Sequence, residues 1–240
     1  ATVTGDMTVD TSTLKVDSSN NRVGIGTASP SYNVHSVTTS GSDYAGFFHN
    51  SAGSGNGTAL VVKGGANNTG AGTFIVQDYS GNTDLMVDGN GHVTMPNQPA
   101  FSVHKNGTNQ DDISASSVDV VVTWATELYD VNSDFDLSTE TFTAPVTGKY
   151  QFNLMLCLLN TDNDANYVAP AIKTSNNIYR FILDPNVGQD MSYWAVPISV
   201  LADMDANDTC SIAVFTSGGA AQVDVEGSAS YTWFTGYLAF

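Results

Sequence analysis

Positively charged residues are scarce in this sequence. It holds 7 Lys and Arg against 24 Asp and Glu, which gives a formal net charge of −17 over 240 residues. Such a surface repels the phosphates of nucleic acids and of anionic bilayers. Cationic partners and divalent cations are the electrostatically favoured companions. The composition therefore excludes nucleic-acid binding and membrane insertion as expected functions.

Cysteine and long apolar runs are scarce too. Cys157 and Cys210 lie in apolar segments, which predicts two buried thiols and leaves a disulfide open. A fold without a disulfide framework fits assembly in a reducing compartment. The most apolar run, residues 152–159, has the length of a strand and not of a membrane helix. No signal-like segment follows Ala1, and we expect the chain to be a fragment of a longer protein.

Helical patterns are the third absence. Leu, Glu and Lys are sparse, whereas Val, Thr, Ser, Asn and Gly dominate the sequence. No window sustains an apolar period of about 3.6 residues, and many short segments alternate apolar and polar residues instead. Both observations favour strands over helices. The sequence predicts an all-β protein.

Residues 1–95 are predicted to form an elongated, repetitive β shaft. Short apolar segments recur there, each followed by an acidic or glycine-rich turn. Two stretches, Leu14–Thr27 and Leu85–Met95, look like copies of one hairpin-like module. Each copy has too few apolar residues to bury a core alone, so it must pack on other modules or on other chains. We expect each copy to pack on other chains.

A resemblance to known fibres supports the packing of these modules on other chains. Residues Asn21–Pro30, followed by Tyr32-Asn-Val34-His, are similar to units that recur in bacteriophage tail fibres and related surface fibres, in which three chains intertwine. The resemblance implies a trimeric shaft. Pro96-Asn-Gln-Pro99 resists both helix and central strand, so residues 96–99 are predicted to be a linker.

Residues 100–240 are predicted to form a separate β head. Apolar, alternating segments recur there at short, regular intervals, with turn residues between them. Such spacing is typical of sandwiches and jelly rolls. The predicted strands are 101–104, 118–125, 140–144, 149–159, 167–174, 178–183, 191–201, 209–217, 221–226 and 229–240.

Two motifs relate this head to a known superfamily. Phe142–Phe152 reads Phe-x-x-Pro-x-x-Gly-x-Tyr-x-Phe, and Phe234–Phe240 closes the chain with Phe-Thr-Gly-Tyr. Together they resemble the jelly-roll heads of the complement-q and tumour necrosis factor superfamily. The resemblance implies a ten-stranded jelly roll that works as a trimer and binds other molecules. The turn Met204–Asp208 departs from the superfamily's usual Gly-Asp, and a collagen-like stalk is missing, so we expect no animal complement function.

Alternating acidic residues predict a candidate calcium site. Three triplets occur: Asp130-x-Asn132-x-Asp134, Asp162-x-Asp164-x-Asn166 and Asp203-x-Asp205-x-Asn207. Ca²⁺ takes about six to eight oxygen ligands, but no triplet continues as a calcium-binding helix–loop–helix. If alternate loops of the roll share one end, the last two triplets meet there. The candidate ligands are then Asp162, Asp164, Asp203, Asp205 and Asp208. Solvated turns are the alternative, and no cofactor is required.

Aromatic residues of the head supply the candidate contact sites. Aromatics in strands are more often core or interface than ligand platform. The predicted trimer core and interface residues are Tyr150, Phe152, Tyr231, Trp233 and Tyr237. The predicted receptor-binding residues are Tyr167, Tyr179, Tyr193 and Trp194.

Catalytic motifs are missing from the sequence. His35, His49, His92 and His104 all lie in the predicted shaft or close to the linker, and no nucleophile elbow, phosphate loop or zinc-binding helix motif occurs. A carboxylate pair for glycoside hydrolysis stays open in a chain so rich in Asp. We predict a protein that is not an enzyme.

The predicted function is structural and adhesive. We expect the distal part of a trimeric phage or viral tail fibre, whose head attaches to a cell-surface receptor or polysaccharide and whose N-terminal end joins other fibre or tail proteins. The alternative is a bacterial or archaeal surface adhesin or extracellular filament subunit, and a polysaccharide-degrading tailspike is a third reading. The expected location is the virion or the cell surface.

Overall fold

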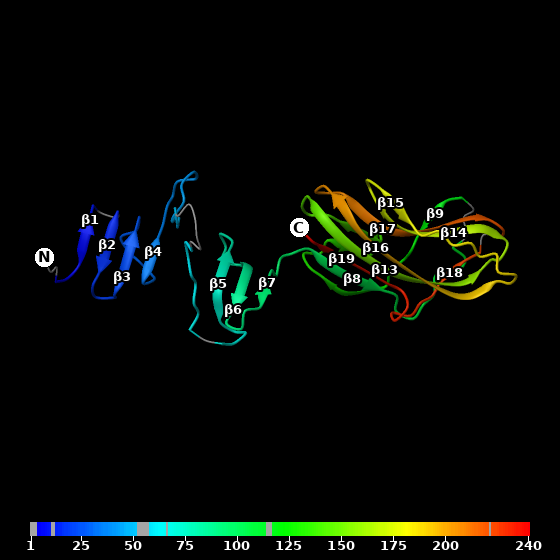
Figure 1. Ribbon diagram of the computed structural model, residues 1–240, viewed down its shortest axis with the longest axis horizontal. Coiled ribbons are helices and arrows are strands. Elements are labelled where there is room, and N and C mark those ends of the chain that lie inside the picture. Colours follow the sequence, from blue (N-terminus) through cyan, green and yellow to red (C-terminus); the bar gives the residue numbers. More distant parts are fainter. Residues whose placement is uncertain (1–3, 11–12, 52–57, 66, 114–116, 221) are drawn as a thin grey trace. The chain divides into compact units, whose positions relative to one another are not determined.

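The computed structural model describes residues 4–10, 13–51, 58–65, 67–113, 117–220 and 222–240. These residues contain nineteen strands and no helix, so the all-β prediction is confirmed (Figure 1). The described residues hold no helix able to cross a membrane. The chain divides into two compact units, Ala1–Gly65 and Ala66–Phe240. Residues 67–95, predicted as shaft, therefore belong to the same unit as the head.

The first unit contains one four-stranded sheet. Its strand order follows the sequence: β1 (Met7–Val9), β2 (Leu14–Asp17), β3 (Arg22–Ile25) and β4 (Val34–Ser36). The first three strands are antiparallel, and β4 runs parallel to β3. The β2–β3 hairpin is the first of the two predicted modules.

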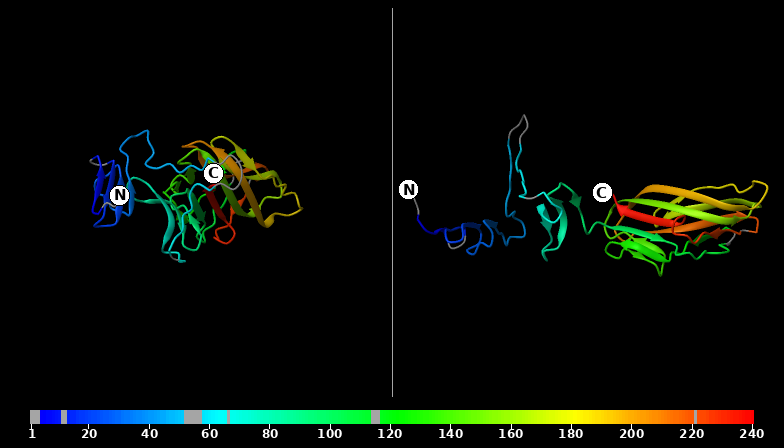
Figure 2. Two further views of the ribbon diagram at one scale, coloured as in Figure 1. Left: turned by 60° about the vertical axis from the view of Figure 1, so that its left-hand side comes forward. Right: turned by 90° about the horizontal axis from the view of Figure 1, so that it is seen from below.

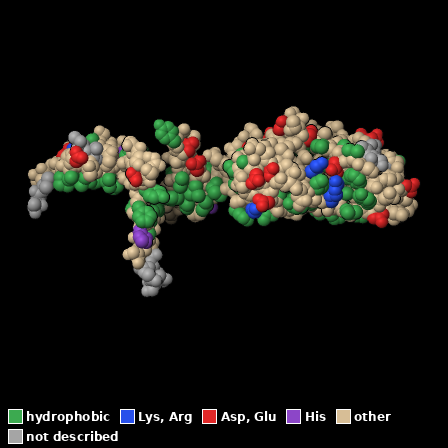
Figure 3. Space-filling view, turned by 90° about the horizontal axis from the view of Figure 1, so that it is seen from above, with side chains coloured by type: hydrophobic (Ala, Val, Ile, Leu, Met, Phe, Trp, Pro, Cys, Tyr) green, Lys and Arg blue, Asp and Glu red, His purple; other side chains and the backbone are tan. Residues whose placement is uncertain are grey.

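This sheet has one apolar face. Residues directly opposite one another in a sheet share a face. One face therefore carries two cross-strand rows, Met7–Val16–Val23–Val34 and Val9–Leu14–Ile25–Ser36. The other face carries the row Thr8–Lys15–Gly24–His35. Hydrophobic side chains gather along one side of this sheet in Figure 3.

A three-stranded meander opens the second unit. It consists of β5 (Gly72–Gln77), β6 (Thr83–Asp88) and β7 (Val93–Thr94), all antiparallel. The β6–β7 hairpin is the second predicted module. The β5–β6 hairpin is a third copy of this module, beside the two that the sequence predicted. Its turn, like those of β2–β3 and β6–β7, begins with an aspartate that accepts hydrogen bonds from residues of the turn.

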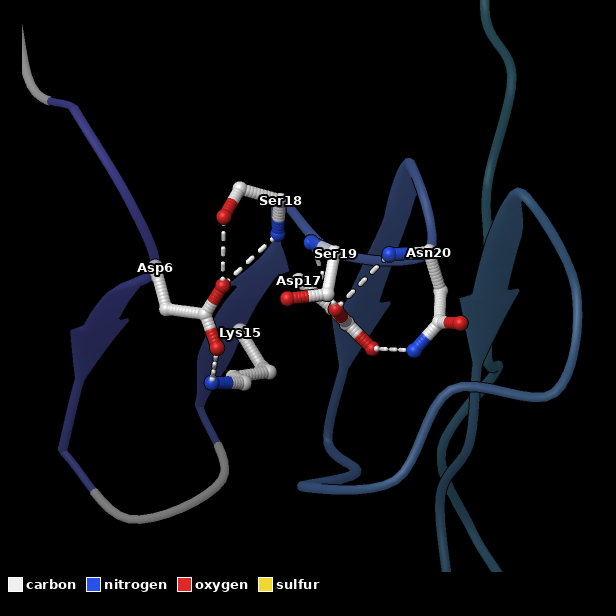
Figure 4. Close-up of polar contacts among 6 residues, drawn as sticks. All are labelled: Asp6, Lys15, Asp17, Ser18, Ser19 and Asn20. Atoms are coloured by element: carbon white, nitrogen blue, oxygen red, sulfur yellow. Dashed lines mark hydrogen bonds and ion pairs between the residues drawn. The ribbon is translucent and has the colours of Figure 1, made fainter.

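An aspartate at the start of each hairpin turn holds the turn closed. Asp17 accepts hydrogen bonds from the backbone N–H of Asn20 at 3.1 Å and from its side-chain amide at 2.8 Å (Figure 4). Asp78 does the same with Asn82, both at 2.9 Å. Asp88 accepts from the backbone N–H of His92 at 2.9 Å. Asp is frequent in turns because its carboxylate reaches backbone N–H groups a few residues on.

The head is a two-layered sandwich. Figure 2 shows its strands in two further views. Sheet one has the order β10-β8-β19-β13-β16, with β18 beside β13, and sheet two has the order β11-β12-β17-β14-β15, with β9 beside β17. The bounds in sheet one are Thr126–Asp130 (β10), Ala100–His104 (β8), Trp233–Leu238 (β19), Gly148–Thr161 (β13), Met191–Met204 (β16) and Asp224–Val225 (β18). Those in sheet two are Phe135–Asp136 (β11), Thr141–Thr143 (β12), Thr209–Gly218 (β17), Ala165–Thr174 (β14), Ile178–Arg180 (β15) and Asp119–Val121 (β9).

This topology confirms the predicted jelly roll. Ten strands lie on the two sheet paths, and all pairs are antiparallel with neighbours that are mostly far apart in sequence. Each of the ten predicted segments contains a strand. Strands β10 and β11 were missed because they are short and rich in acidic residues, which strands usually avoid.

The core between the sheets is aromatic. Phe101, Phe142, Phe152 and Phe234 are fully buried. The ring of Phe101 lies 4.9 Å from that of Phe142 and 5.0 Å from that of Phe234, measured between centroids. Gly236 pairs directly with Phe101 and Phe152 and leaves the space that their rings fill. Both sequence motifs thus belong to one core.

Candidate binding surfaces

Tyr150 and Phe152 lie inside the sandwich and correct one prediction. Both side chains are fully buried within a single chain, and the Tyr150 hydroxyl donates a hydrogen bond to the carbonyl of Val146 at 2.8 Å. They were predicted at the trimer core or interface. The opposite face of their strand, β13, is the one that points away from sheet two, because side chains alternate along a strand.

The outward face of sheet one exposes large side chains near the end where the chain enters the head. Tyr237 and Leu201 flank Gln151 in one cross-strand row, and Tyr129 lies in a neighbouring row. They are about half exposed, at 47%, 50% and 49%. We call these three residues the tyrosine face. Tyr237 was predicted as an interface residue, whereas Tyr129 and Leu201 were missed.

A pocket lies towards the other end of the same outward face. It has a volume of about 370 Å³ and is lined by Cys157, Tyr193, Ala195 and Tyr231. Tyr193 and Tyr231 are 73% and 57% exposed. The sequence assigned the first to receptor binding and the second to the interface, and the structure brings them together. Trp233, the remaining interface candidate, is half-buried on the same face.

The other three receptor-binding candidates do not join this pocket. Tyr179 and Trp194 are partly buried and pack against the core of the sandwich. Tyr167 is also partly buried, and its ring stacks on Phe215 with centroids 5.8 Å apart. The Arg180 guanidinium lies 5.2 Å from the centre of the same Phe215 ring. These contacts hold the three aromatics against their own chain.

Both cysteines are free and buried, as predicted. Burial and, to a lesser extent, the carboxylate of Glu226 raise the pKa of the Cys157 thiol. Cys210 is fully buried in the core, and burial raises the pKa of its thiol as well. Cys157 lines the pocket described above, and its exposed fraction is 5%.

The second and third acidic triplets do not meet, contrary to the expectation of a shared apex. Strands β13 and β16 pair along their full length, with Gly148 opposite Met204 at one end and Thr161 opposite Met191 at the other. The triplet at Asp203 therefore lies about 40 Å along the strands from the triplet at Asp162. The described residues contain no group of three or more His, Cys, Asp or Glu arranged to hold a metal ion.

Three of the five candidate calcium ligands accept hydrogen bonds in turns or form an ion pair within the chain. Asp162 accepts from the backbone N–H of Asp164 at 2.9 Å. Asp203 pairs with the Lys149 ammonium at 2.5 Å. Asp208 accepts from the Ser175 hydroxyl at 2.7 Å and from the backbone N–H of Asp205 at 2.7 Å. These carboxylates therefore have donors from their own chain, as aspartates in turns often do.

Chelation of Ca²⁺ is expected to leave the thermal stability of the head unchanged. The carboxylates of Asp162, Asp203 and Asp208 already have donors within the chain, so removing calcium exposes no repulsion among them. Thermal unfolding with excess EDTA and with added Ca²⁺ measures this. A melting temperature that falls on chelation and returns with Ca²⁺ would contradict the expectation.

The first triplet holds an unusual carboxylate. Asp130 accepts from the backbone N–H groups of Asp134 and Phe135, at 3.1 and 3.0 Å. Oxygen Oδ2 of Asp134 is buried and has no hydrogen-bond donor within the described residues. Burial, together with the charge of Asp130, raises the pKa of Asp134 to about 6. The spacing in the sequence flagged this triplet but not the difference between its two carboxylates.

Comparisons with known proteins find similarity to solved structures over part of the chain. No family model matches the sequence, and no curated protein does. Among solved structures, the globular domain of zebrafish complement 1qA protein is similar over 60% of this chain and 98% of its own, at 20% identity and a TM-score of 0.44. Murine APRIL is similar over 59% of this chain and 98% of its own, at 10% identity and a TM-score of 0.42. The sheet order of residues 100–240 described above is that of a jelly roll.

Proposed function

We propose that this chain is a subunit of a homotrimeric fibre, with a shaft that assembles the trimer and a head that attaches to a cell-surface receptor. The apolar face of the β1–β4 sheet carries this proposal. The setting that best fits the resemblance at Asn21–Pro30 is the distal part of a phage or viral tail fibre. The work of the protein is then binding and not catalysis.

The β1–β4 sheet needs a cover. Val9, Ile25 and Val34 on its apolar face are 51%, 48% and 71% exposed in the single chain. A single-layered sheet is not stable alone unless its apolar face packs against another layer. Further copies of the same chain supply that layer, because each copy carries the same face.

The distribution of charge supports packing of the apolar face against other copies of this chain. Each copy has a formal charge of −17, so three copies carry −51 and repel one another. The two rows on the apolar face contain no charged residue. Asp6 and Lys15 pair at 2.6 Å outside those rows, as Figure 4 shows. Contact through the uncharged face lets apolar burial outweigh the repulsion.

The head favours a ring over a two-fold dimer. Besides the tyrosine face on sheet one, exposed apolar residues lie in and directly after the edge strand β15 of sheet two: Ile178, Phe181 and Ile182, which are 40%, 38% and 68% exposed. Two different patches suit a contact in which these edge residues of one copy meet the tyrosine face of the next. Such head-to-tail contacts form a ring when the rotation between copies closes, as a threefold rotation does. Three heads per fibre would add avidity to weak receptor contacts.

The test replaces Val16 and Val23 by Asp. The double variant places two charges in the apolar face of each copy, and we expect the native mass to fall from three times 25.3 kDa, about 76 kDa, to that of the single chain. Native mass spectrometry measures this. The matched control is Thr8→Asp, which adds charge to the polar face and should leave the trimer intact. A monomeric wild-type protein would overturn the proposal, as would a double variant as trimeric as the control.

A further inference from the structure

We propose that residues 44–48, which we call the aromatic segment, pack on the apolar face of the β1–β4 sheet of a neighbouring copy. This inference rests on the proposed function, because it requires more than one copy of the chain. It also deepens that function, since it names the part of the neighbouring copy that covers the sheet.

The aromatic segment is not covered by its own chain. Its three rings, Tyr44, Phe47 and Phe48, are 84%, 78% and 67% exposed. Phe47 lies 5.7 Å from His49, measured between ring centroids, but this contact stays within the same stretch of chain. Every residue from 37 to 51 is exposed. Three large rings within five residues form a contiguous apolar patch, and such patches mark interaction sites more often than single exposed residues do.

Two uncovered apolar surfaces therefore occur in the same compact unit. One is the aromatic segment, and the other is the sheet face that leaves Val9, Ile25 and Val34 exposed. Within one chain the two surfaces do not cover each other, since both stay exposed. A contact between copies covers both at once. Each aromatic ring can bury roughly 150–250 Å², so the segment offers enough area to cover part of two apolar rows.

The aromatic segment begins at the edge of the sheet. Strand β4 is an edge strand, because it pairs with β3 alone among the described residues. At the end of β4 the Ser36 hydroxyl donates a hydrogen bond to the carbonyl of Ala45. Figure 2 shows, in its right-hand view, that the chain beyond β4 extends away from this sheet. The segment is thus held at the border of the sheet, where a neighbouring copy would begin.

The absence of charge on both surfaces favours their contact. The two apolar rows of the sheet contain no charged residue, and residues 44–48 read Tyr-Ala-Gly-Phe-Phe. Copies that each carry −17 approach at least cost through uncharged surfaces. Each copy supplies one segment and one face, so the two match in number. Because the surfaces differ, the contact is head-to-tail, and a threefold rotation closes it into a ring.

The first experiment replaces Phe48 of the full chain by the photoreactive p-benzoylphenylalanine, which on irradiation bonds to C–H groups that it touches. We expect a covalent dimer on a denaturing gel, at about twice 25.3 kDa. Mass spectrometry of the joined peptides should place the bond on residues of the apolar rows of β1–β4. The matched control carries the same group at Tyr79, a fully exposed aromatic of the other compact unit, and should give no dimer.

The second experiment replaces Phe47 and Phe48 together by serine. Both side chains are largely exposed in the single chain, so the double variant should fold, and the near-ultraviolet circular dichroism of the head core should be unchanged. Sedimentation over a range of concentrations should show the trimer dissociating at a concentration at least about tenfold higher than for the wild type. Tyr79→Ser is the matched control and should leave the dissociation unchanged.

Three outcomes in a protein with the native mass of a trimer would overturn the inference and leave the proposed function standing. The first is a double serine variant that is as trimeric as Tyr79→Ser, because the sheets would then pack only on one another. The second is a bond formed only within one copy, without a covalent dimer. The third is a covalent dimer joined through residues 100–240. A monomeric wild-type protein would instead overturn the proposed function, and this inference with it.

Discussion

Replacing Gly236 by alanine is expected to destabilise the head by about 2–3 kcal/mol. A Cβ atom at this position would lie 2.5 Å from a ring carbon of Phe101 and 2.6 Å from one of Phe152. Both rings are fully buried and packed against other aromatics, so neither can move without cost. The melting temperature of the head should fall by roughly 10 °C. Thermal unfolding followed by near-ultraviolet circular dichroism measures it.

Two further variants test whether the loss of stability comes from a collision between the new methyl group and the aromatic rings. Thr235→Ala changes the neighbouring residue on the outward face of β19 and should alter stability by no more than about 0.5 kcal/mol. Phe101→Leu removes one of the obstructing rings, so it should cost less in the Gly236→Ala background than in the wild type. Equal costs in both backgrounds would mean that the ring and the new methyl group do not collide.

Replacing Asp134 by asparagine is expected to stabilise the head at neutral pH. Folding raises the pKa of this carboxyl from an ordinary 3.8 to about 6, because it is partly buried and faces Asp130. The folded state therefore favours the protonated form. The stability that this group contributes is fully present below pH 3.8 and is lost as the pH rises through 6. A shift of about two pKa units corresponds to about 3 kcal/mol, which solvent screening reduces to about 1–2 kcal/mol.

Asparagine stays neutral at every pH, so its advantage should be absent near pH 4 and fully developed above pH 7. Urea unfolding of both proteins between pH 4 and pH 8 measures the difference. Asp136→Asn is the matched control, because Asp136 accepts from the backbone N–H and the hydroxyl of Ser138, at 2.8 and 2.7 Å, which lowers its pKa. That variant should lose stability at neutral pH. A pH-independent gain for Asp134→Asn would disprove the assigned cause.

Much of the head could be predicted from sequence because its strands alternate strongly. Segments such as 149–159 carry apolar residues at every second position, and each predicted segment contains a strand. Strands β10 and β11 were missed because they are both short and rich in acidic residues, as in Phe135–Asp136. The turns of the hairpin modules were recognised through Asp and Gly, whose local chemistry is the same wherever the chain goes.

The candidate site could be predicted only in part. Tyr193 and Tyr231 were singled out as exposed or interfacial aromatics, but they were assigned to different surfaces. Nothing in the sequence predicts that Cys157 and Ala195 line a pocket, because small residues in a strand are usually expected to be buried in the core. The pocket exists because β13 pairs with β16 in one register, and a register joins residues 38 positions apart in sequence, such as Cys157 and Ala195. No local pattern encodes that pairing.

The sequence by itself determined the all-β class, most of the strands and the acidic and glycine-rich turns of the hairpin modules. These follow from side-chain period and turn chemistry, which act over a few residues. Only the tertiary structure decided that Tyr150 and Phe152 face their own second sheet, that two acidic triplets lie at opposite ends of one strand pair, and that Tyr193 meets Tyr231. Alternation says that a strand has two faces, but what covers each face depends on strands that are distant in the chain.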